Sequence, residues 1–422
     1  MLTKALRKLP EPMSNFIRQA GEFADELKMN VYVVGGFVRD LYLDVPNFDV
    51  DLVVEGEGIF FAQECARRLS LKAVTHRRFG TATLHGCDGF KADVASARKE
   101  TYEKPGALPV VSQGQIKDDL SRRDFTINAM AISINRSSYG ETFDFYGGLT
   151  DLKNGKVRIL HSLSFVDDPT RILRAVRFEQ RFCFRLEEQT LKSLRRAVRD
   201  KMLLCVQKHR LRDELILIFG EERPWKALRR LEALCGFSFI APSFSCAKGW
   251  EAQGQKVRKA AQWFEANCPG HRRLEVYVMF MCLFFSCLPT RRLKDVIFSY
   301  AFHKGESLRM LSFKKHGRRV DRLLSAASLR PSRVYRLLAP LSYEVIMLIF
   351  ALTKSARSRR RIRDFLLFYN GVRLHVRGED LVQMGAKPGP LFKKVLERLL
   401  FAKLDGKVKN KEEELSFAQR RL

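Results

Sequence analysis

The sequence predicts an α+β protein in which a small mixed sheet is followed by an all-α remainder. Short runs rich in β-branched residues occur between residues 31 and 95, and a stretch with helical spacing separates the second run from the third. From about residue 160 onward the strand signals stop and helical spacing takes over. A chain of 422 residues, 46% of them hydrophobic, is long enough for two or more cores.

The predicted elements begin with an amphipathic helix over residues 15–27, with Ser14 as a candidate N-terminal cap. Its apolar face holds Phe16, Ala20, Phe23, Ala24 and Leu27. The predicted strands cover 31–34, 49–54, 72–75, 81–85 and 91–95, and a helix covers 59–69. Residues 99–118 contain proline and glycine without clear periodicity, so we expect a long loop, which is usually functional or disordered.

The remaining chain has helical spacing in many segments. These segments are 168–182, 191–198, 209–219, 224–234, 332–341 and 390–404. The most hydrophobic run, 276–288, is shorter than the roughly 20 residues that cross a bilayer, and Arg291 and Arg292 follow it. We therefore expect a buried helix there and no membrane contact.

Charge is distributed unevenly along the chain. The formal net charge is +29, yet residues 1–160 carry 22 basic against 21 acidic residues, which leaves 54 against 26 for the rest. Such an excess indicates a polyanionic partner. A neutral N-terminal part suits metal and nucleotide, and a basic C-terminal part suits RNA. A uniformly basic surface would instead have spread the charge evenly.

The nine cysteines form no CxxC pair. Cys268 with His271, and Cys282 with Cys287, lack a second half that would complete a zinc site, so we expect ordinary buried thiols. Such cysteine usage fits a reducing cytoplasm. The first residues also lack an apolar segment of signal-peptide length.

The strongest chemical signal is a glycine turn followed by two spaced aspartates. A strand that ends in Gly35 and Gly36 and opens a helix lets backbone N–H groups approach a triphosphate. Asp49 and Asp51 are two residues apart on the next strand and therefore share a face. Two converging carboxylates favour Mg²⁺ together with substrate phosphates, in a two-metal site that activates a 3′-hydroxyl and stabilises leaving pyrophosphate. Asp93, on a later strand, is the candidate third carboxylate.

These residues resemble a known family. GGFVRD at 35–40 followed by DVD at 49–51 resembles the head of class II CCA-adding enzymes and bacterial poly(A) polymerases, within the DNA polymerase β-like nucleotidyltransferases. SRRDFTINA at 121–129 resembles the RRDxxxNA motif, which implies ribose and phosphate contacts through Arg123, Asp124 and Asn128. DFYGGLTDL at 144–152 resembles the segment that links head to neck and allows head movement.

Two further motifs complete the nucleotide site that the resemblance implies. DDPTR at 167–171 resembles EDxxR, whose aspartate and arginine pair with the incoming base, and RLRDE at 210–214 resembles the supporting RxxxE motif. The nucleotide-binding residues expected on this basis are Gly35, Gly36, Arg39, Arg123, Asp124, Asn128, Asp168, Arg171 and Arg174. The one departure is Asp167 in place of glutamate, which bears on how Arg171 is held.

Asp168 and Arg171 also make physical sense as a base reader. Three residues apart on a helix, they would project from one face. A carboxylate accepts hydrogen bonds and a guanidinium donates them, so together they can match ATP, or CTP after a small rotation. The alternative interpretation is a helix start with aspartates favoured by the helix dipole and a surface arginine; both can hold.

The C-terminal stretch 377–390 is similar to the family's tail, which contacts the tRNA elbow. Lys387, Lys393 and Lys394 are the expected tRNA-binding residues, and Lys403, Lys407 and Lys409 are also suited to phosphates. Lys393 stands where the family often has glycine.

The resemblance implies four parts: a catalytic head at 1–155, a neck at 156–220, a basic body at 221–370 and a tail at 371–422. It implies an enzyme that uses Mg²⁺ and ATP, and CTP if cytidine is also added, to extend the 3′ end of tRNA without a template. The alternatives are a poly(A) polymerase and a catalytically idle RNA-binding protein. The tail favours tRNA, and the full-length loop at 99–118 favours addition of A; whether C is also added stays open.

Overall fold

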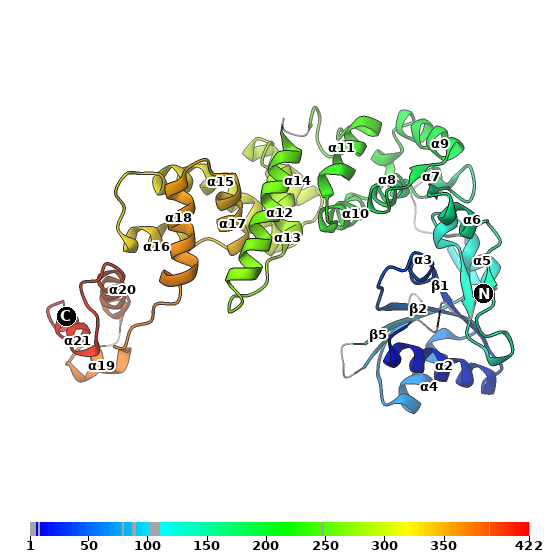
Figure 1. Cartoon of the computed structure of the whole chain (residues 1–422), viewed down its shortest axis with the longest axis horizontal. Helices are drawn as coiled ribbons and strands as arrows, with labels where there is room; N and C mark the ends of the chain where they lie inside the picture. The colour runs from blue at the N-terminus through cyan, green and yellow to red at the C-terminus, as the bar shows by residue number, and fades with distance from the viewer. Residues whose placement is uncertain are drawn as a thin grey trace. The chain divides into compact units, whose positions relative to one another are not determined.

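The computed structural model describes residues 6, 9–77, 80–86, 90–101, 110–245, 249–387 and 389–421. The chain forms two compact units. The first contains residues 1–214 with 233–235, and the second contains residues 215–232 with 236–422. The class predicted from sequence is confirmed, because the first unit holds the main sheet and the second is helical (Figure 1).

The main sheet has seven strands in the described residues, in the order β3-β4-β5-β2-β1-β8-β9. β2 and β5 pair in parallel, and the other neighbours are antiparallel. The strands are β1 (Asn30–Val34), β2 (Asp49–Glu55), β3 (Lys72–His76), β4 (Thr81–His85), β5 (Lys91–Ser96), β8 (Ala131–Ser133) and β9 (Thr142–Phe143). The five strands predicted from sequence are confirmed, whereas β8 and β9 were not predicted.

Helices cover one face of this sheet. α4 packs across β2 to β5, and α2 packs against β1 and α4, on the same side (Figure 1). The helices of the first unit are α2 (Glu11–Glu26), α3 (Gly36–Tyr42), α4 (Gly58–Leu69), α5 (Ile116–Ser121), α6 (Gly148–Lys153), α7 (Ser164–Asp167), α8 (Arg171–Arg181) and α9 (Glu188–Arg199), and α10 (Lys208–Gly220) leads into the second unit. The expectation that Ser14 caps the first helix is wrong, because α2 begins earlier, with Pro10 as its N-cap residue.

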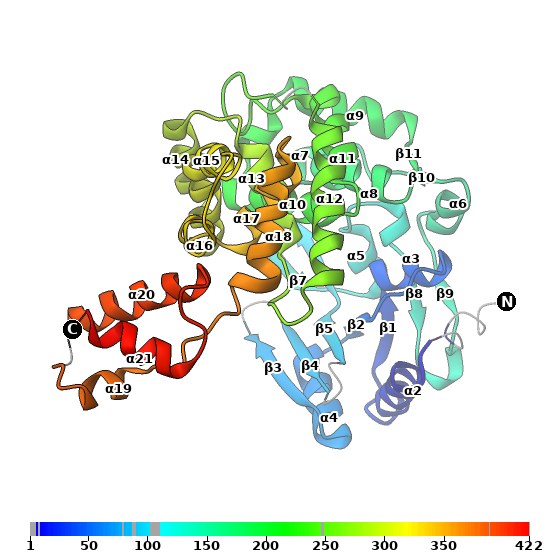
Figure 2. The same ribbon diagram turned by 60° about the vertical axis from the view of Figure 1, so that its left-hand side comes forward.

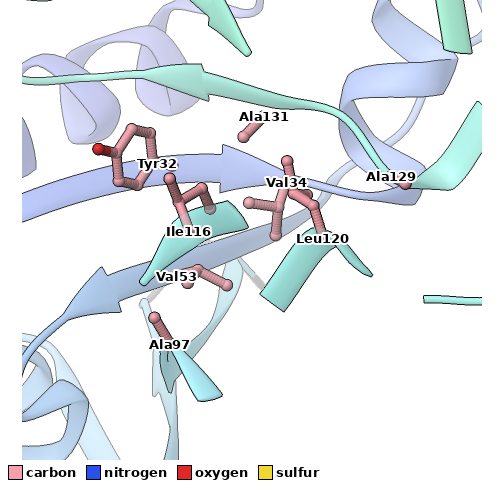
Figure 3. Close-up of a cluster of buried hydrophobic side chains, with 8 residues drawn as sticks. All are labelled: Tyr32, Val34, Val53, Ala97, Ile116, Leu120, Ala129 and Ala131. Carbon is pink, nitrogen blue, oxygen red and sulfur yellow. The ribbon is translucent and has the colours of Figure 1, made fainter. Parts of the chain in front are cut away.

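The other face of the sheet carries a second apolar cluster, shown in Figure 3. Tyr32 and Val34 of β1 and Val53 of β2 pack there with Ile116 and Leu120 of α5. Because side chains alternate along a strand, the residues two and four before Val53 lie on this same face. The α5 face of the sheet is therefore the face that carries the two aspartates of β2.

The segment expected to be a loop is partly ordered. β6 (Arg98–Thr101) and β7 (Val110–Gln113) form an antiparallel pair, and α5 follows. The structureless loop predicted over 99–118 is thus wrong at both ends, while its middle, 102–109, lies outside the described residues. A further parallel pair joins β10 (Lys156–Val157) to β11 (Arg185–Leu186), so one short strand occurs after residue 160.

The second unit is helical, and α17 packs against both α12 and α18 in it (Figure 2). Its helices are α11 (Pro224–Cys235, whose last residues belong to the first unit), α12 (Trp250–Asn267), α13 (Val276–Phe285), α14 (Thr290–Ser299), α15 (Lys304–Leu324), α16 (Pro331–Leu338), α17 (Tyr343–Leu352), α18 (Ala356–Asp364), α19 (Gly378–Gln383), α20 (Pro390–Leu404) and α21 (Lys411–Gln419). A π-helical turn, Phe365–Tyr369, continues α18.

The hydrophobic run predicted to be a buried helix is confirmed as α13. Every residue from Val278 to Phe285 is buried. Glu344 of α17 is also fully buried, and Arg272 donates hydrogen bonds to both of its carboxylate oxygens at 2.7 and 2.8 Å.

Among the described residues, no single helix has the length and hydropathy to cross a bilayer. Helices α16 and α17, with an angle of 114° between them, meet those two criteria only when they are taken together.

The last three helices form a cluster of their own around Leu381, Val395 and Leu399. The buried carboxylate of Glu414 in α21 accepts hydrogen bonds from the backbone N–H groups of His375 and Val376 at 2.8 and 2.9 Å. It also binds the Lys403 ammonium at 2.6 Å. Lys403 is therefore part of the fold, contrary to the expectation that it faces phosphates.

Gly21 tests the packing of α2 on the sheet. A Cβ at this position would overlap the carbonyl oxygen of Ile134, which is backbone and cannot rotate away. Gly21→Ala is expected to lower the free energy of unfolding by about 1–3 kcal/mol, the usual effect of overpacking. Chemical denaturation would measure this effect, and Gly220→Ala, where nothing lies within 4 Å of the new Cβ, should change it little.

Candidate active site

The candidate site begins at the turn between β1 and α3. Gly35 has φ +69°, and a side chain there would collide with the guanidinium of Arg123. Glycine is needed on both counts, since it tolerates the left-handed backbone and lets the arginine approach. The structure thus places Arg123 against the glycine turn, as the motifs predict for two parts of one site.

Three carboxylates stand on the α5 face of β2 and β5. Asp49 and Asp51 are two residues apart on β2, and the parallel register sets Asp51 beside Asp93 of β5. Asp49 is exposed, whereas Asp51 and Asp93 are half-buried. Asp93 accepts hydrogen bonds from the Thr83 hydroxyl at 2.6 Å and the Lys91 ammonium at 2.7 Å, so its orientation is fixed.

The row of three carboxylates, Asp49, Asp51 and Asp93, has an unfavourable electrostatic environment. Burial raises the pKa of Asp51 to about 6; the positive charge of Arg123 opposes this shift, while Asp93 and Asp49 add to it. Burial also raises the pKa of Asp93, but the hydrogen bonds from Lys91 and Thr83 outweigh it and bring that pKa below its usual value. A desolvated carboxylate beside two others is stabilised by a cation.

The donor set fits Mg²⁺ in an open site. Within the described part of the chain, no group of three His, Cys, Asp or Glu side chains is arranged to hold a metal ion. Mg²⁺ usually takes only one or two carboxylates and completes its shell with water and substrate phosphates. Asp49 and Asp51 are therefore suitable ligands, and Asp93 stands next to them.

A chain of buried polar side chains leads from α3 to α10. Arg39 forms a two-pronged ion pair with Asp40 and donates to Asn128 at 2.6 Å. Asn128 donates to Asp124 at 2.9 Å, and Arg174 donates to the other oxygen of Asp124 at 2.7 Å.

Arg174 also reaches Glu214 at 3.0 Å. Burial lowers the pKa of Arg39, whereas for Arg174 the charges of Asp124 and Glu214 outweigh burial and raise the pKa. Arg39, Asp124, Asn128 and Arg174, all expected to bind nucleotide, thus hold one another in place.

The predicted base-reading pair has a different geometry from the one expected. Asp168 ends α7 in an extended conformation, and Arg171 begins α8, so the two do not share one helix face. Asp168 accepts hydrogen bonds from the backbone and hydroxyl of Thr170 at 3.1 and 2.7 Å, and from Arg210 at 2.8 Å. The single-face argument is therefore wrong, because a turn at Pro169 separates the residues.

Arg171 is held independently of Asp167. It donates to the Ser164 hydroxyl and to the carbonyl of Arg122, both at 2.7 Å. Asp167 instead lies 3.8 Å from His161. The replacement of glutamate by Asp167 consequently leaves the observed hold on Arg171 intact.

These side chains surround a pocket of about 490 Å³. Seven arginines and four carboxylates contribute to its wall, which gives it a positive balance suited to a nucleoside triphosphate. It is lined by Gly36, Arg39, Asp51, Glu100, Arg122, Arg123, Asp124, Asn128, Asp168, Arg171, Arg174, Arg177, Phe178 and Arg181. A neighbouring pocket of about 420 Å³ contains Asp93 and shares Asp51, Arg122 and Arg123 with the first. Asp51 therefore stands where the two pockets meet.

The pocket contains residues that sequence reasoning missed. Phe178 and Arg181 follow Arg171 and Arg174 on α8 at spacings of three, four and three, which is one helix face. The Arg39 guanidinium lies 5.2 Å from the centre of the Phe178 ring, a cation–π distance. The helical period of α8 could have revealed this stripe. Glu100 could not be found, because it lay in a segment predicted to be loop.

The expected tRNA-binding lysines lie in the second unit. Lys387 follows α19, and Lys393 and Lys394 are the fourth and fifth residues of α20. All three are exposed. Pro388, which belongs to the same predicted motif, lies outside the described residues.

Comparison with known proteins shows the family to which the chain belongs. Residues 31–158 match the family model for the poly A polymerase head domain. The fold and the site therefore define a nucleotidyltransferase of the poly(A) polymerase type.

The chain is 37% identical over 419 residues to an A-adding tRNA nucleotidyltransferase of Geobacter sulfurreducens. The match covers 98% of this chain and 48% of the relative. It is 34% identical to an A-adding tRNA nucleotidyltransferase of Halalkalibacterium halodurans, covering 96% and 91%. The chain belongs to the tRNA nucleotidyltransferase family.

Solved structures extend the similarity over the whole chain. A Thermotoga maritima CCA-adding enzyme complexed with tRNA is 35% identical with a TM-score of 0.72, covering 99% of this chain and 98% of that one. CCA-adding enzyme complexes with ATP and with CTP are each 35% identical, with TM-scores of 0.75 and 0.73. They cover 98% of this chain and 96% and 97% of theirs. This chain spans about half the length of the Geobacter relative.

The raised pKa of Asp51 predicts how the stability of the protein depends on pH. Its pKa of about 6 lies above the ordinary value of 3.8, so above pH 6 the folded, metal-free protein holds an unfavourable charge. Asp51→Asn is expected to stabilise the protein in EDTA by roughly 1–3 kcal/mol at pH 8. The gain should shrink as the pH falls below 6 and vanish below about 3.8, where Asp51 is protonated in both the folded and the unfolded state.

Urea denaturation across this pH range would measure the effect. Mg²⁺ should stabilise the wild type more than Asp51→Asn. A variant that is destabilised at pH 8 in EDTA would contradict the strained-carboxylate interpretation.

Proposed function

We propose that this protein adds a terminal adenosine to the 3′ end of tRNA that already ends in CC, using ATP and releasing pyrophosphate. The observation that carries the proposal is the position of Asp51 between the arginine-rich pocket and the pocket that contains Asp93. A triphosphate in the first would reach the carboxylate row from one side, and an RNA 3′-hydroxyl in the second would reach it from the other.

Asp49 and Asp51 would hold Mg²⁺, which when bound activates the 3′-hydroxyl and neutralises the departing pyrophosphate. Asp93, fixed by Thr83 and Lys91, would supply the neighbouring carboxylate. Arg123 at the glycine turn would contact the triphosphate, since a guanidinium matches phosphate geometry. The fixed positions of these side chains would lower the cost of reorganisation in the transition state.

Asp168 and Arg171 would read the base. Each is already oriented by hydrogen bonds, Asp168 by Thr170 and Arg210 and Arg171 by Ser164 and Arg122. An acceptor and a donor held rigidly in one pocket can select adenine by its edge. Such a pair would do the work of a template.

Addition of A alone is supported by the names of the two relatives, both A-adding enzymes that match nearly all of this chain. A second candidate is addition of the full CCA sequence. It is favoured by the similarity, across the whole chain, to CCA-adding enzymes solved with CTP and with ATP. A basic second unit with an exposed lysine tail fits a tRNA substrate in either case.

We also propose a four-part division, with a head at 1–155, a neck at 156–220, a body at 221–370 and a tail at 371–422. A cytoplasmic location accords with the free thiols of Cys65, Cys183, Cys205, Cys268, Cys282 and Cys287.

The proposed reaction is tested by incubating the protein with labelled ATP or CTP, Mg²⁺, and tRNA ending in CC or lacking CCA. We expect ATP incorporation into the CC-ended tRNA only. Asp49→Ala should abolish it while tRNA binding persists, because the carboxylate acts on the chemistry and not on RNA affinity.

Other outcomes identify the alternatives. CTP incorporation into tRNA lacking CCA would mean full CCA addition. Long adenosine ladders on unrelated RNA would mean a poly(A) polymerase. Absence of any incorporation with retained RNA affinity would mean a non-catalytic RNA-binding protein.

The tail lysines make a separate, quantitative prediction. If Lys393 and Lys394 contact phosphates, the double change to alanine should weaken tRNA binding and reduce the slope of log affinity against log salt by about 1.5 to 2, from fewer released counterions. Filter binding over a salt series would measure the slope. Two exposed lysines of α12, Lys256 and Lys259, serve as the matched control. Equal slopes for the tail variant and the wild type would exclude the contact.

A further inference from the structure

A buried carboxylate outside the predicted motifs lies at the centre of the candidate site. Asp119, in α5, is 0% exposed. Its Oδ1 accepts hydrogen bonds from Arg122 at 3.0 and 2.6 Å, and its Oδ2 accepts hydrogen bonds from Arg123 at 3.2 and 2.8 Å. Arg122 and Arg123 follow Asp119 by three and four residues, so one helical turn brings both arginines next to its carboxylate.

The two arginines lead to different parts of the site. Arg123 lies against the turn at Gly35 and lines both pockets. Arg122 donates to Glu100 of β6 at 3.0 Å, and its carbonyl accepts the hydrogen bond from Arg171 at 2.7 Å. The glycine turn, the β6–β7 hairpin and the start of α8 are therefore all connected to Asp119 through one or two contacts.

We propose that Asp119 is a positioning residue for nucleotide addition, which sets Arg123 for the triphosphate and, through Arg122, aligns the β6–β7 hairpin with the base-reading Arg171. The proposal rests on the proposed function, since it takes Arg123 and Arg171 as nucleotide ligands. Asp119 lies outside the recognised motifs. It connects the arginine proposed to bind the triphosphate, Arg123, with the arginine proposed to read the base, Arg171.

Because the two carboxylate oxygens of Asp119 accept from different arginines, we expect that an amide cannot replace the carboxylate. Each oxygen accepts hydrogen bonds from one guanidinium, and burial shields both oxygens from water. In Asp119→Asn only the amide oxygen still accepts hydrogen bonds, and the amide nitrogen meets a second set of N–H donors. One of the two arginines must then lose its hold.

A purely structural ion pair would make different predictions. Loss of such a pair destabilises the fold and affects all activities in proportion. A positioning role instead raises the KM for ATP and relaxes base selection while tRNA affinity stays constant. The readouts that separate the roles are therefore the KM for ATP, the ratio of ATP to GTP incorporation, and the tRNA dissociation constant.

Asp119→Asn is expected to raise the KM for ATP about 10- to 100-fold, the usual range when a supporting contact is lost. The ratio of ATP to GTP incorporation should fall, and tRNA affinity should change less than about twofold. Asp119→Glu should restore part of the loss.

A second variant keeps the test decisive if Asp119→Asn does not fold. Glu100→Gln weakens the link between Arg122 and the hairpin without touching Asp119, and should also lower ATP selectivity. Arg98→Ala is the matched control, because Arg98 binds the same Glu100 oxygen at 2.8 Å but does not line the pocket. Arg98→Ala should leave selectivity unchanged.

Unchanged ATP KM and selectivity in Asp119→Asn, or in Glu100→Gln where the first variant is unfolded, would overturn the inference. Failure of the proposed function is a distinct result, namely no addition by the wild type to any tRNA. Calorimetric titration with ATP and with AMP then still tests Asp119: a loss for ATP alone in Asp119→Asn supports it, and equal affinities in wild type and variant refute it.

Discussion

The parallel pairing of β2 with β5 brings Asp51 beside Asp93 on a face that α5 partly covers, and the arrangement of the site follows from that pairing. A carboxylate placed there is desolvated and repelled by its neighbours, and the pKa of Asp51 rises to about 6 as a result. Such a charge is tolerated only where cations can approach it. The approach of Arg123 permitted by Gly35, and the open side of the carboxylate row, both meet that condition.

The polar chain from Arg39 to Glu214 explains how so many charges share one pocket wall. Each buried donor in it faces an acceptor, so the arginines are ion-paired before any ligand arrives. Removing one partner from such a chain leaves a buried charge without compensation, which is far more harmful than losing an exposed pair. The chain therefore acts as a rigid frame, and the nucleotide would meet the parts of these groups that face the pocket.

The two aspartates of β2 could be predicted from the sequence as one row, but the residues that surround them could not. Period-two spacing placed Asp49 and Asp51 on one face, and the alternation of β2 made that deduction secure. β8 and β9 have only three and two residues, too few for an alternating pattern, so no local pattern revealed them. Ser14 was misread as a cap because a serine inside a helix looks the same in sequence as one at its start.

Long-range contacts account for the remaining errors. The spacing of Asp168 and Arg171 suggested one helix, but Pro169 and an extended Asp168 place a turn between them. Lys403 looked like a surface cation until its partner Glu414, in another helix, was known. Asp119 belonged to no recognised motif, and only the folded positions of Arg122 and Arg123 show what it holds. The motifs thus located the site, whereas the contacts that orient it depended on tertiary structure.

The anchoring of Glu414 has a consequence for the C-terminal segment as a whole. This one side chain joins α21 to the backbone at 375–376 and to α20, so the first and last parts of the three-helix cluster depend on each other. Loss of α21 after proteolysis between α20 and α21 would therefore affect more than the C-terminal residues themselves. It would release the clamp on the linker that precedes α19 and leave the apolar sides of α19 and α20 uncovered.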